Sequence, residues 1–181
     1  MERTTAKKQA KWVLDPTHSE LTFKVKHLMI SNVKGEFKAF SIEVDGEDIF
    51  KSNVQVTIDA SSINTNNTDR DNHLKSADFF DIENHKELAF KSISFKKTDD
   101  DAYELKGLLT IKGISKEVAL EVEFGGINKD PWGNEKAGLS VSGKINRKDW
   151  GLNWNAALET GGVLVSEEVK ISGEIQFVKQ S

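Results

Sequence analysis

The segment from Arg70 to Phe80 gathers ionisable and aromatic side chains that could bind a polar group or take part in chemistry. Arg70 carries a planar guanidinium, which can form forked hydrogen bonds to a phosphate or a carboxylate. His73 can gain or lose a proton near neutral pH, so it could assist as a donor or as a base. Phe79 and Phe80 close the segment as adjacent aromatics. We therefore predict the polar end of a ligand site here.

A structural interpretation of the same segment stays open beside this one. Arg70 could pair with Asp71, Asp78 or Asp81 and so hold a long loop in place without contacting a ligand. The two phenylalanines could plug the end of a hydrophobic core. A plug at the mouth of a cavity would also contact a ligand, so Phe79 and Phe80 are assigned to ligand contact under either interpretation.

The four histidines do not form a metal or catalytic pattern. His18, His27, His73 and His85 include no pair three or four residues apart and no HExxH run, so no metal site is predicted. The chain has no GxSxG segment, and no catalytic residue or cofactor is assigned. His27 ends a run with one apolar face, where an imidazole needs a polar partner or a ligand. We assign His27 to ligand contact.

Composition excludes several functional classes. The chain has 181 residues, of which 37% are hydrophobic, enough for one sizeable core in one domain. A net charge of -4 gives no basic field for a nucleic acid. The absence of cysteine excludes disulfides and thiol chemistry. No segment reaches the roughly 20 apolar residues of a membrane-spanning helix.

Apolar and polar residues alternate with a period of two along most of the chain, which is typical of strands with one buried face. This pattern covers residues 20–27, 54–60, 103–111, 118–124, 137–145 and 169–177. Two further runs, 36–44 and 88–95, change phase midway and predict β-bulges. The fold class is therefore all-β, a single antiparallel extended barrel of about eight strands, because closure removes exposed edges.

Three glycines bear on whether the barrel is filled or hollow. Gly107, Gly143 and Gly173 are in phase with large apolar neighbours, so three strands lose side-chain volume at inward positions. These glycines could serve only as bends at barrel corners. The alternative is a long apolar cavity. Its predicted lining is Phe23, Val25, Phe37, Leu105, Leu139, Val141 and Ile171, together with the three glycines.

Residues 61–87 form a long connection rich in Asn, Thr and Asp, which in a compact domain usually has a function or its own structure. Thr68 or Asp69 could cap a short helix that runs through Ser76. Such a helix would turn Leu74 toward the barrel mouth, so Leu74 is also assigned to ligand contact.

Two more loops are predicted at residues 125–138 and 146–162, where glycine, proline and asparagine interrupt the alternation. Trp150 and Trp154 lie in the second loop. Trp154 is assigned to ligand contact. If the barrel were filled, the segment from Trp150 to Trp154 would instead be an exposed surface for a protein partner.

The N-terminal residues 1–10 are predicted to be a disordered tail that precedes a barrel domain of residues 11–181. They carry Arg3, Lys7 and Lys8 and are followed by no long apolar stretch of the kind a signal peptide needs. We therefore expect a cytoplasmic protein. Removal of a signal peptide, with Met1 supplied by cloning, would make it periplasmic or extracellular.

Several short motifs together resemble the YceI-like family, and they run from about Trp12 to Val178. The motifs are Trp12–Asp15, His18–Ser19, Phe23–His27, Val33–Phe37, Arg70–Phe80, Leu105–Gly113 and Arg147–Leu152, in the order that the family has them. Two positions depart from the family pattern, which usually has a proline at Lys86 and a threonine at Ser115. Both are predicted loop positions.

The resemblance implies a lipocalin-like barrel whose apolar tunnel holds a polyisoprenoid or a similar long-chain amphiphile. The leading hypothesis is then a non-enzymatic protein that binds, carries or stores an isoprenoid or fatty-acyl lipid, with its polar head near Arg70, His73 and His27. The alternative is an enzyme acting on such an amphiphile, with His27 or His73 as general base. Two barrels could also pair as a homodimer.

Overall fold

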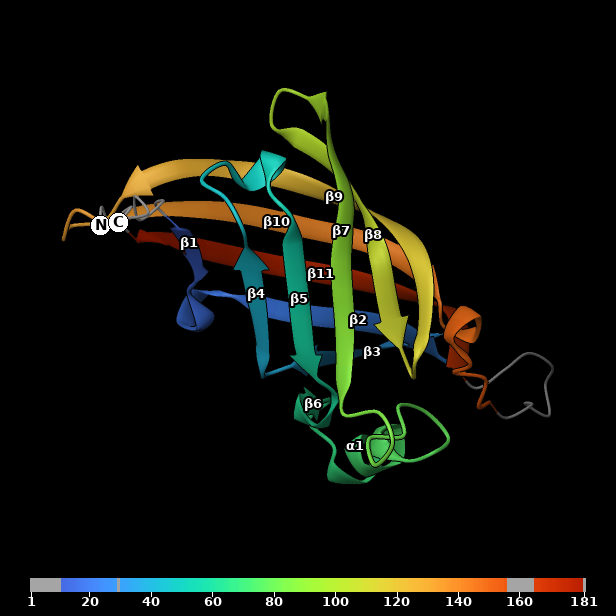
Figure 1. Cartoon of the computed structure of the whole chain (residues 1–181). Helices are drawn as coiled ribbons and strands as arrows, with labels where there is room; N and C mark the ends of the chain where they lie inside the picture. The colour runs from blue at the N-terminus through green and yellow to red at the C-terminus, as the bar shows by residue number, and fades with distance from the viewer. Residues whose placement is uncertain (1–10, 29, 156–164, 181) are drawn as a thin grey trace, which may run out of the picture.

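The structure is a computed structural model that describes residues 11–28, 30–155 and 165–180. Its main element is a curved antiparallel sheet with one α-helix, α1, beside one end (Figure 1). The predicted disordered tail, residues 1–10, lies outside the described residues. Among the described residues, no helix is long and apolar enough to cross a bilayer.

Most of the strands follow the alternating runs of the sequence, whereas the short strands at 11–14 and 63–64 and the helices were not predicted by those runs. The strands are β1 (Lys11–Leu14), β2 (Glu20–His27), β3 (Ser31–Phe37), β4 (Phe40–Val44), β5 (Val54–Asp59), β6 (Ile63–Asn64), β7 (Glu87–Asp99), β8 (Ala102–Ile111), β9 (Ile114–Lys129), β10 (Glu135–Asn146) and β11 (Val165–Gln180). The helices are η1 (Pro16–His18), η2 (Ile49–Lys51), η3 (Ala60–Ser62), α1 (Thr68–Lys75) and η4 (Arg147–Trp150).

The sheet closes on itself through β11, the last strand. One edge of β11 pairs with β10, and its other edge pairs first with β2 and then with β1. Because β1 also pairs with β4, the ring β1, β4, β5, β7, β8, β9, β10 and β11 is complete, which makes eight strands. All the pairs are antiparallel. The predicted barrel of about eight strands is confirmed.

Both predicted changes of phase coincide with irregularities in the sheet. In the run 36–44, β3 ends at Phe37 and β4 begins at Phe40, so the chain bends between two strands. In the run 88–95, the pairing of β7 with β8 shifts between Ser92 and Ser94. In β7 an extra residue reverses which side chains face inward, as the predicted bulge requires. The bulge predicted in the run 36–44 is wrong, because two separate strands joined by a bend stand there.

The predicted loop at residues 125–138 is mostly strand. β9 continues to Lys129 and β10 begins at Glu135, so only a short turn remains between them. The Asp130 side chain accepts hydrogen bonds from the backbone amides of Trp132 and Asn134, which fixes this turn. The ends of these two strands contain glycine and polar residues, so they lack the alternation of apolar and polar residues that predicts a strand. They are strands all the same, because backbone hydrogen bonding does not need an apolar face.

The helix predicted in the 61–87 connection is present as α1, but its cap differs. The Asn67 side chain accepts a hydrogen bond from the backbone amide of Arg70, so Asn67 is the N-cap rather than Thr68 or Asp69. Asparagine is among the strongest capping residues, because its short side chain reaches the unpaired amides of the first turn.

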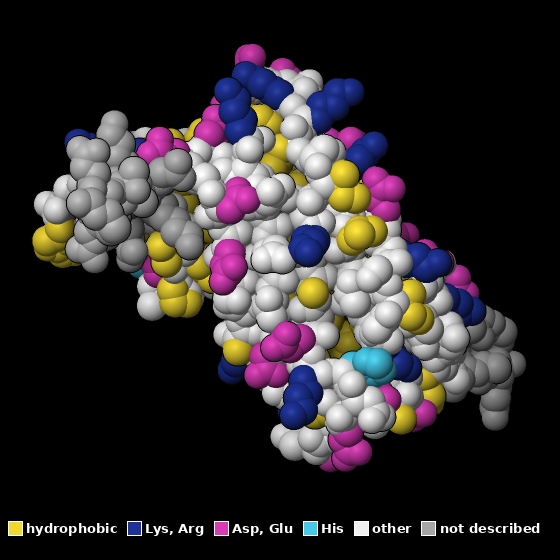
Figure 2. All heavy atoms as spheres, viewed as in Figure 1, with side chains coloured by type: hydrophobic (Ala, Val, Ile, Leu, Met, Phe, Trp, Pro, Cys, Tyr) yellow, Lys and Arg dark blue, Asp and Glu magenta, His cyan; other side chains and the backbone are white. Residues whose placement is uncertain are grey.

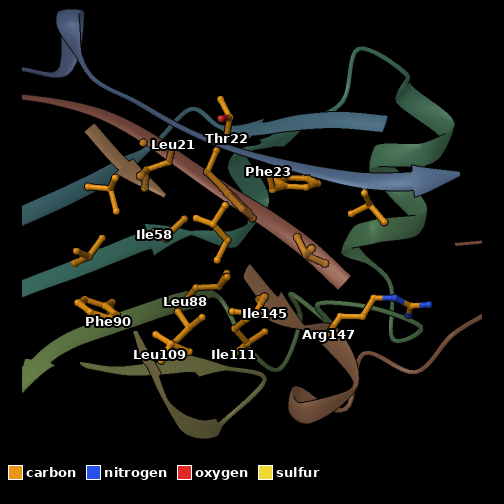
Figure 3. A pocket seen from close by; sticks show the side chains of 18 of the residues that line it. Leu21, Thr22, Phe23, Ile58, Leu88, Phe90, Leu109, Ile111, Ile145 and Arg147 are labelled. Carbon is orange, nitrogen blue, oxygen red and sulfur yellow. The ribbon is translucent and has the colours of Figure 1, made fainter. Parts of the chain in front are cut away.

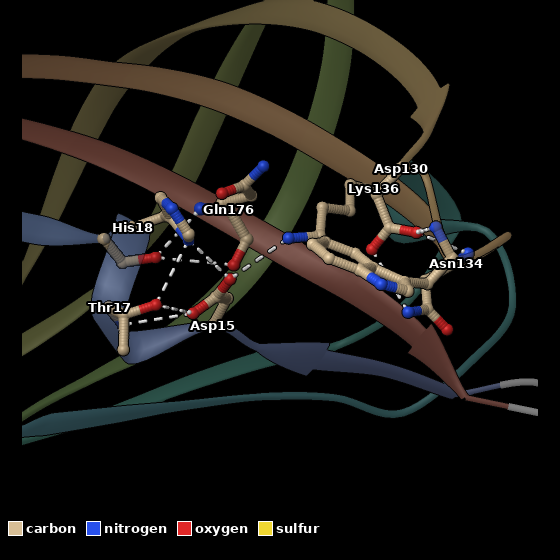
Figure 4. A network of polar contacts seen from close by, with 9 residues as sticks. Asp15, Thr17, His18, Asp130, Asn134, Lys136 and Gln176 are labelled. Atoms are coloured by element: carbon tan, nitrogen blue, oxygen red, sulfur yellow. Dashed lines mark hydrogen bonds and ion pairs between the residues drawn. The ribbon is translucent and has the colours of Figure 1, made fainter.

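A polar cluster around Asp15 joins β1 to β2 along the edge of β11 (Figure 4). The Asp15 carboxylate accepts hydrogen bonds from the Thr17 amide (3.0 Å) and the Thr17 hydroxyl (2.7 Å). It also contacts His18 Nδ1 at 2.8 Å and Lys136 Nζ at 3.6 Å. The Thr17 hydroxyl, followed by His18, lowers the pKa of Asp15 well below its usual range. The charged carboxylate therefore stabilises the fold.

The Asp15→Asn variant is expected to be less stable than the wild type by about 1–2 kcal/mol at neutral pH, because it loses hydrogen bonds to a charged acceptor. The folded pKa of Asp15 lies below its unfolded value of about 3.9, so its contribution is complete above that pH and falls below it. Urea unfolding at pH 7 and pH ~3 measures both effects. The exposed Asp100→Asn variant is the control. The difference between wild type and Asp15→Asn should be smaller at pH ~3 than at pH 7, and a difference that is equally large at both pH values would contradict this account.

Candidate functional site

A cavity of about 620 Å³ lies inside the barrel. Figure 3 shows side chains from opposite walls converging on it, among them Leu21, Phe23, Ile58 and Leu109. The walls are apolar because each strand turns its apolar face inward. This volume is in the range of sites for small-molecule ligands, and an eight-stranded barrel is just wide enough to hold one.

Fifteen of the seventeen predicted ligand-binding residues line this cavity. Those on the strands are Phe23, Val25, His27, Phe37, Leu105, Leu139, Val141, Ile171 and Gly173. Those from α1 and the later connections are Arg70, His73, Leu74, Phe79, Phe80 and Trp154. The structure thus brings these residues together around one space, and their contact with a ligand stays a prediction.

Gly107 and Gly143 do not line the cavity, which differs from the prediction. A Cβ atom added to Gly143 would lie 2.5 Å from Leu120 Cδ2, and one added to Gly107 would meet the Phe90 ring and lie 2.5 Å from the Lys91 carbonyl oxygen. These two glycines therefore make room for side chains of neighbouring strands. Gly173 differs, because it faces the cavity and its nearest neighbour would be Leu21 Cδ2 at 3.1 Å.

Arg70 is held at one end of the cavity by Thr65. Its Nε donates to the Thr65 hydroxyl at 2.8 Å and its Nη2 donates to the Thr65 carbonyl at 2.7 Å. The Thr65 hydroxyl in turn donates to the buried Asp71 carboxylate. Among the described residues Arg70 forms no ion pair, so the predicted pairing with Asp71, Asp78 or Asp81 is absent. Nη1 of Arg70 is left with donors that a ligand can use.

His73 and His27 occupy the same end of the cavity in different ways. His73 Nε2 lies 2.9 Å from Asp78 Oδ2, and its ring packs edge-on against Phe79 and Trp154 with centroids 5.2 and 4.6 Å apart. The His27 imidazole lines the cavity without a hydrogen bond to any described residue. A polar head of a ligand at this end of the cavity could therefore contact the His27 imidazole, the His73 ring and the Arg70 guanidinium.

Arg147 is a buried residue of this region that we did not predict as part of the site. Only 3% of it is exposed, and it lines the cavity at one end (Figure 3). Burial lowers the pKa of Arg147, and nearby Glu167 opposes the shift. The sequence contained an indication of this position. Arg147 is two residues after Ile145 and so lies on the inward-facing side of the apolar run 137–145, where a charged residue is unexpected.

Four backbone carbonyls satisfy the Arg147 guanidinium. Nε donates to Ser166 at 2.9 Å, Nη1 donates to Leu152 at 2.5 Å and to Trp154 at 2.8 Å, and Nη2 donates to Val165 at 3.3 Å. Arg147 thus ties the segment after η4 to the start of β11. This fixes Trp154, which packs on His73, at the end of the cavity.

The segment from Trp150 to Trp154 is not an exposed surface. Trp150 is 2% exposed, and its indole Nε1 donates to the Leu109 carbonyl at 2.9 Å. The chain turns back at Gly151, whose φ of 74° is easiest for glycine, and Trp154 enters the cavity wall. The predicted partner surface is therefore wrong, because both indoles are used inside the fold.

The fold and the site together define a class of protein. A closed antiparallel eight-stranded barrel around an apolar cavity with a polar end is the architecture of lipocalin-like binding barrels. The described residues hold no group of three or more His, Asp or Glu residues that could bind one metal ion.

The family model of the YceI-like domain matches residues 12–177, and the chain belongs to this family. A UPF0312 protein of Staphylococcus epidermidis is 44% identical over 170 residues, which cover 92% of this chain and 96% of that protein. Among solved structures, the Campylobacter jejuni YCEI protein is 34% identical, with a TM-score of 0.74 over 86% of this chain and 90% of that one.

A more distant structure has the same fold. It is a polyisoprenoid binding domain from Saccharophagus degradans that is implicated in plant cell wall breakdown. It is 15% identical, with a TM-score of 0.71 over 95% of this chain and 100% of that one. At this identity the likeness concerns the fold alone.

Proposed function

We propose that this protein binds one long-chain amphiphilic lipid, with the chain in the barrel cavity and the polar head near Arg70, His73 and His27. The observation that carries the proposal is the 620 Å³ apolar cavity, which ends beside hydrogen-bond donors that the described residues leave unused. A polyisoprenoid is our first candidate, because the Saccharophagus degradans domain of the same fold is a polyisoprenoid binding domain.

Binding without catalysis accounts for the polar residues best. A histidine that acts as a general base needs a nucleophile or a substrate proton within hydrogen-bond reach. Among the described side chains, His73 is hydrogen-bonded to the Asp78 carboxylate and His27 to none. We therefore propose carriage or storage of the lipid. A cytoplasmic location and a homodimer stay predictions from the sequence.

The length of the lipid chain is expected to set the affinity. Each buried methylene contributes about 0.8 kcal/mol, which corresponds to a roughly fourfold lower Kd for each added carbon. We would titrate lipid-depleted protein with isoprenols and fatty acids of increasing length, and expect the Kd to fall in this way until the cavity is full and then to level off. An affinity that does not change with chain length would contradict binding in the cavity.

A further inference from the structure

Four lysines lie side by side on the outer surface of four neighbouring strands. Lys144 of β10 pairs with Lys170 of β11, Lys170 pairs with Lys24 of β2, and Lys24 pairs with Lys34 of β3. Like charges directly opposite one another destabilise a sheet. Only Lys144 has an ion pair within the described residues, with Glu168 at 3.6 Å. We call these four residues the lysine row.

Protection of a sheet edge does not explain the lysine row, because β2, β10 and β11 each have neighbours on both sides. Figure 1 shows that these strands pass behind β4, β5 and β7. The face over β4, β5 and β7 mixes both signs of charge with small apolar spots (Figure 2). The lysine row, in which all four charges are positive, is therefore a local feature of the wall formed by β10, β11, β2 and β3.

The turn between β2 and β3 exposes apolar side chains near the lysine row. Ile30 is 86% exposed and Leu28 is 39% exposed. Leu28 also has a φ of 55°, which costs a residue with a Cβ atom some strain. The turn directly follows Lys26 and His27, which line the polar end of the cavity. The exposed apolar residues are thus next to the lipid site.

We propose that this turn and the lysine row together bind the surface of a bilayer that contains anionic lipids. Ile30 and Leu28 would enter the interface, and the lysines would contact the anionic head groups, which is how apolar and basic residues combine in interfacial proteins. This inference rests on the proposed function, because a lipid cargo has to leave or enter a bilayer. The contact would bring the polar end of the cavity to the membrane surface.

The test is co-sedimentation of lipid-depleted protein with vesicles of phosphatidylglycerol and phosphatidylcholine in equal parts, at low ionic strength. Wild-type protein is expected to bind these vesicles and not vesicles of phosphatidylcholine alone. The double variant Lys24→Gln and Lys34→Gln is expected to bind roughly 25-fold more weakly, because each lysine near the surface contributes about fivefold to the affinity. Ile30→Glu is expected to lose binding.

Matched controls stand at other places on the barrel. Trp132→Glu changes a side chain that is 82% exposed in the turn between β9 and β10, and the double variant Lys91→Gln and Lys116→Gln removes two exposed charges from β7 and β9. Both are expected to bind as the wild type does. Loss of binding in Trp132→Glu, wild-type binding in Ile30→Glu, or equal affinity for duplex DNA would overturn the proposed surface.

Uptake of isoprenol and fatty-acid probes from solution separates this inference from the proposed function. Probe uptake without vesicle binding would overturn the membrane surface and leave the lipid site in place. Vesicle binding without uptake of any probe would support the membrane surface and contradict the proposed function. Circular dichroism of every variant establishes that the barrel is folded.

Discussion

The Gly173→Leu variant is expected to lose lipid binding by about 100-fold while the barrel stays folded. Gly173 faces the cavity from β11, and its neighbours across the sheet are Val141 and Leu21. An added Cβ would come closest to Leu21 Cδ2, at 3.1 Å, and the end of that side chain can shift. The rest of the new leucine would fill space that three or four methylenes of a lipid would otherwise occupy. Each methylene that is no longer buried lowers the binding free energy by about 0.8 kcal/mol, which together gives the expected loss of affinity.

The matched control is Gly138→Leu in the neighbouring strand β10, where an added Cβ has no neighbour within 4 Å. It adds the same volume outside the cavity and is expected to bind lipid as the wild type does. Gly107 is unsuitable for this test, because its added Cβ would contact backbone at the Lys91 carbonyl. A folded Gly173→Leu protein with wild-type affinity for a long-chain probe would show that the lipid does not occupy the cavity.

The Arg147→Met variant is expected to lose about 3–5 kcal/mol of stability. The change keeps much of the apolar volume but removes the donors of four backbone carbonyls, in a residue that is 3% exposed. Each buried acceptor left without a partner costs about 1–3 kcal/mol, less where water can enter. Urea unfolding followed by circular dichroism measures the loss.

Lys148→Met is the control for this variant, since Lys148 is the next residue and forms an exposed ion pair with Glu167 at 2.8 Å. Exposed pairs are worth about 0–1 kcal/mol, so this variant is expected to stay near wild-type stability. If Arg147→Met lowered the free energy of unfolding no more than Lys148→Met does, the proposed stabilising role of the Arg147 guanidinium would be contradicted.

The barrel could be predicted from the sequence because strand periodicity is a local signal. Each alternating run became a strand, and the slips of phase at 36–44 and 88–95 marked a bend and a bulge. The interruption between β1 and β2 could not be predicted in this way. It depends on Asp15, whose hydrogen bonds to Thr17 form a short turn that has no periodic signature.

The site was harder to predict, because it depends on contacts between distant strands. Gly107 and Gly143 were in the inward phase, yet Phe90 and Leu120 of other strands occupy the space beside them. The burial of Trp150 depends on a carbonyl of β8, 41 residues away along the chain. Such contacts between strands depend on how the barrel closes. The spacing of residues along one strand does not predict them.

The central claim is that the barrel holds a lipid chain in its cavity, and native mass spectrometry of freshly purified protein tests it most directly. Organic extraction and a second mass spectrum would identify whatever adds mass to the chain. We expect one long-chain lipid at close to one molecule per barrel, which Gly173→Leu does not retain. A protein that carries no lipid and takes up none after incubation with isoprenoid and fatty-acyl candidates would contradict the account.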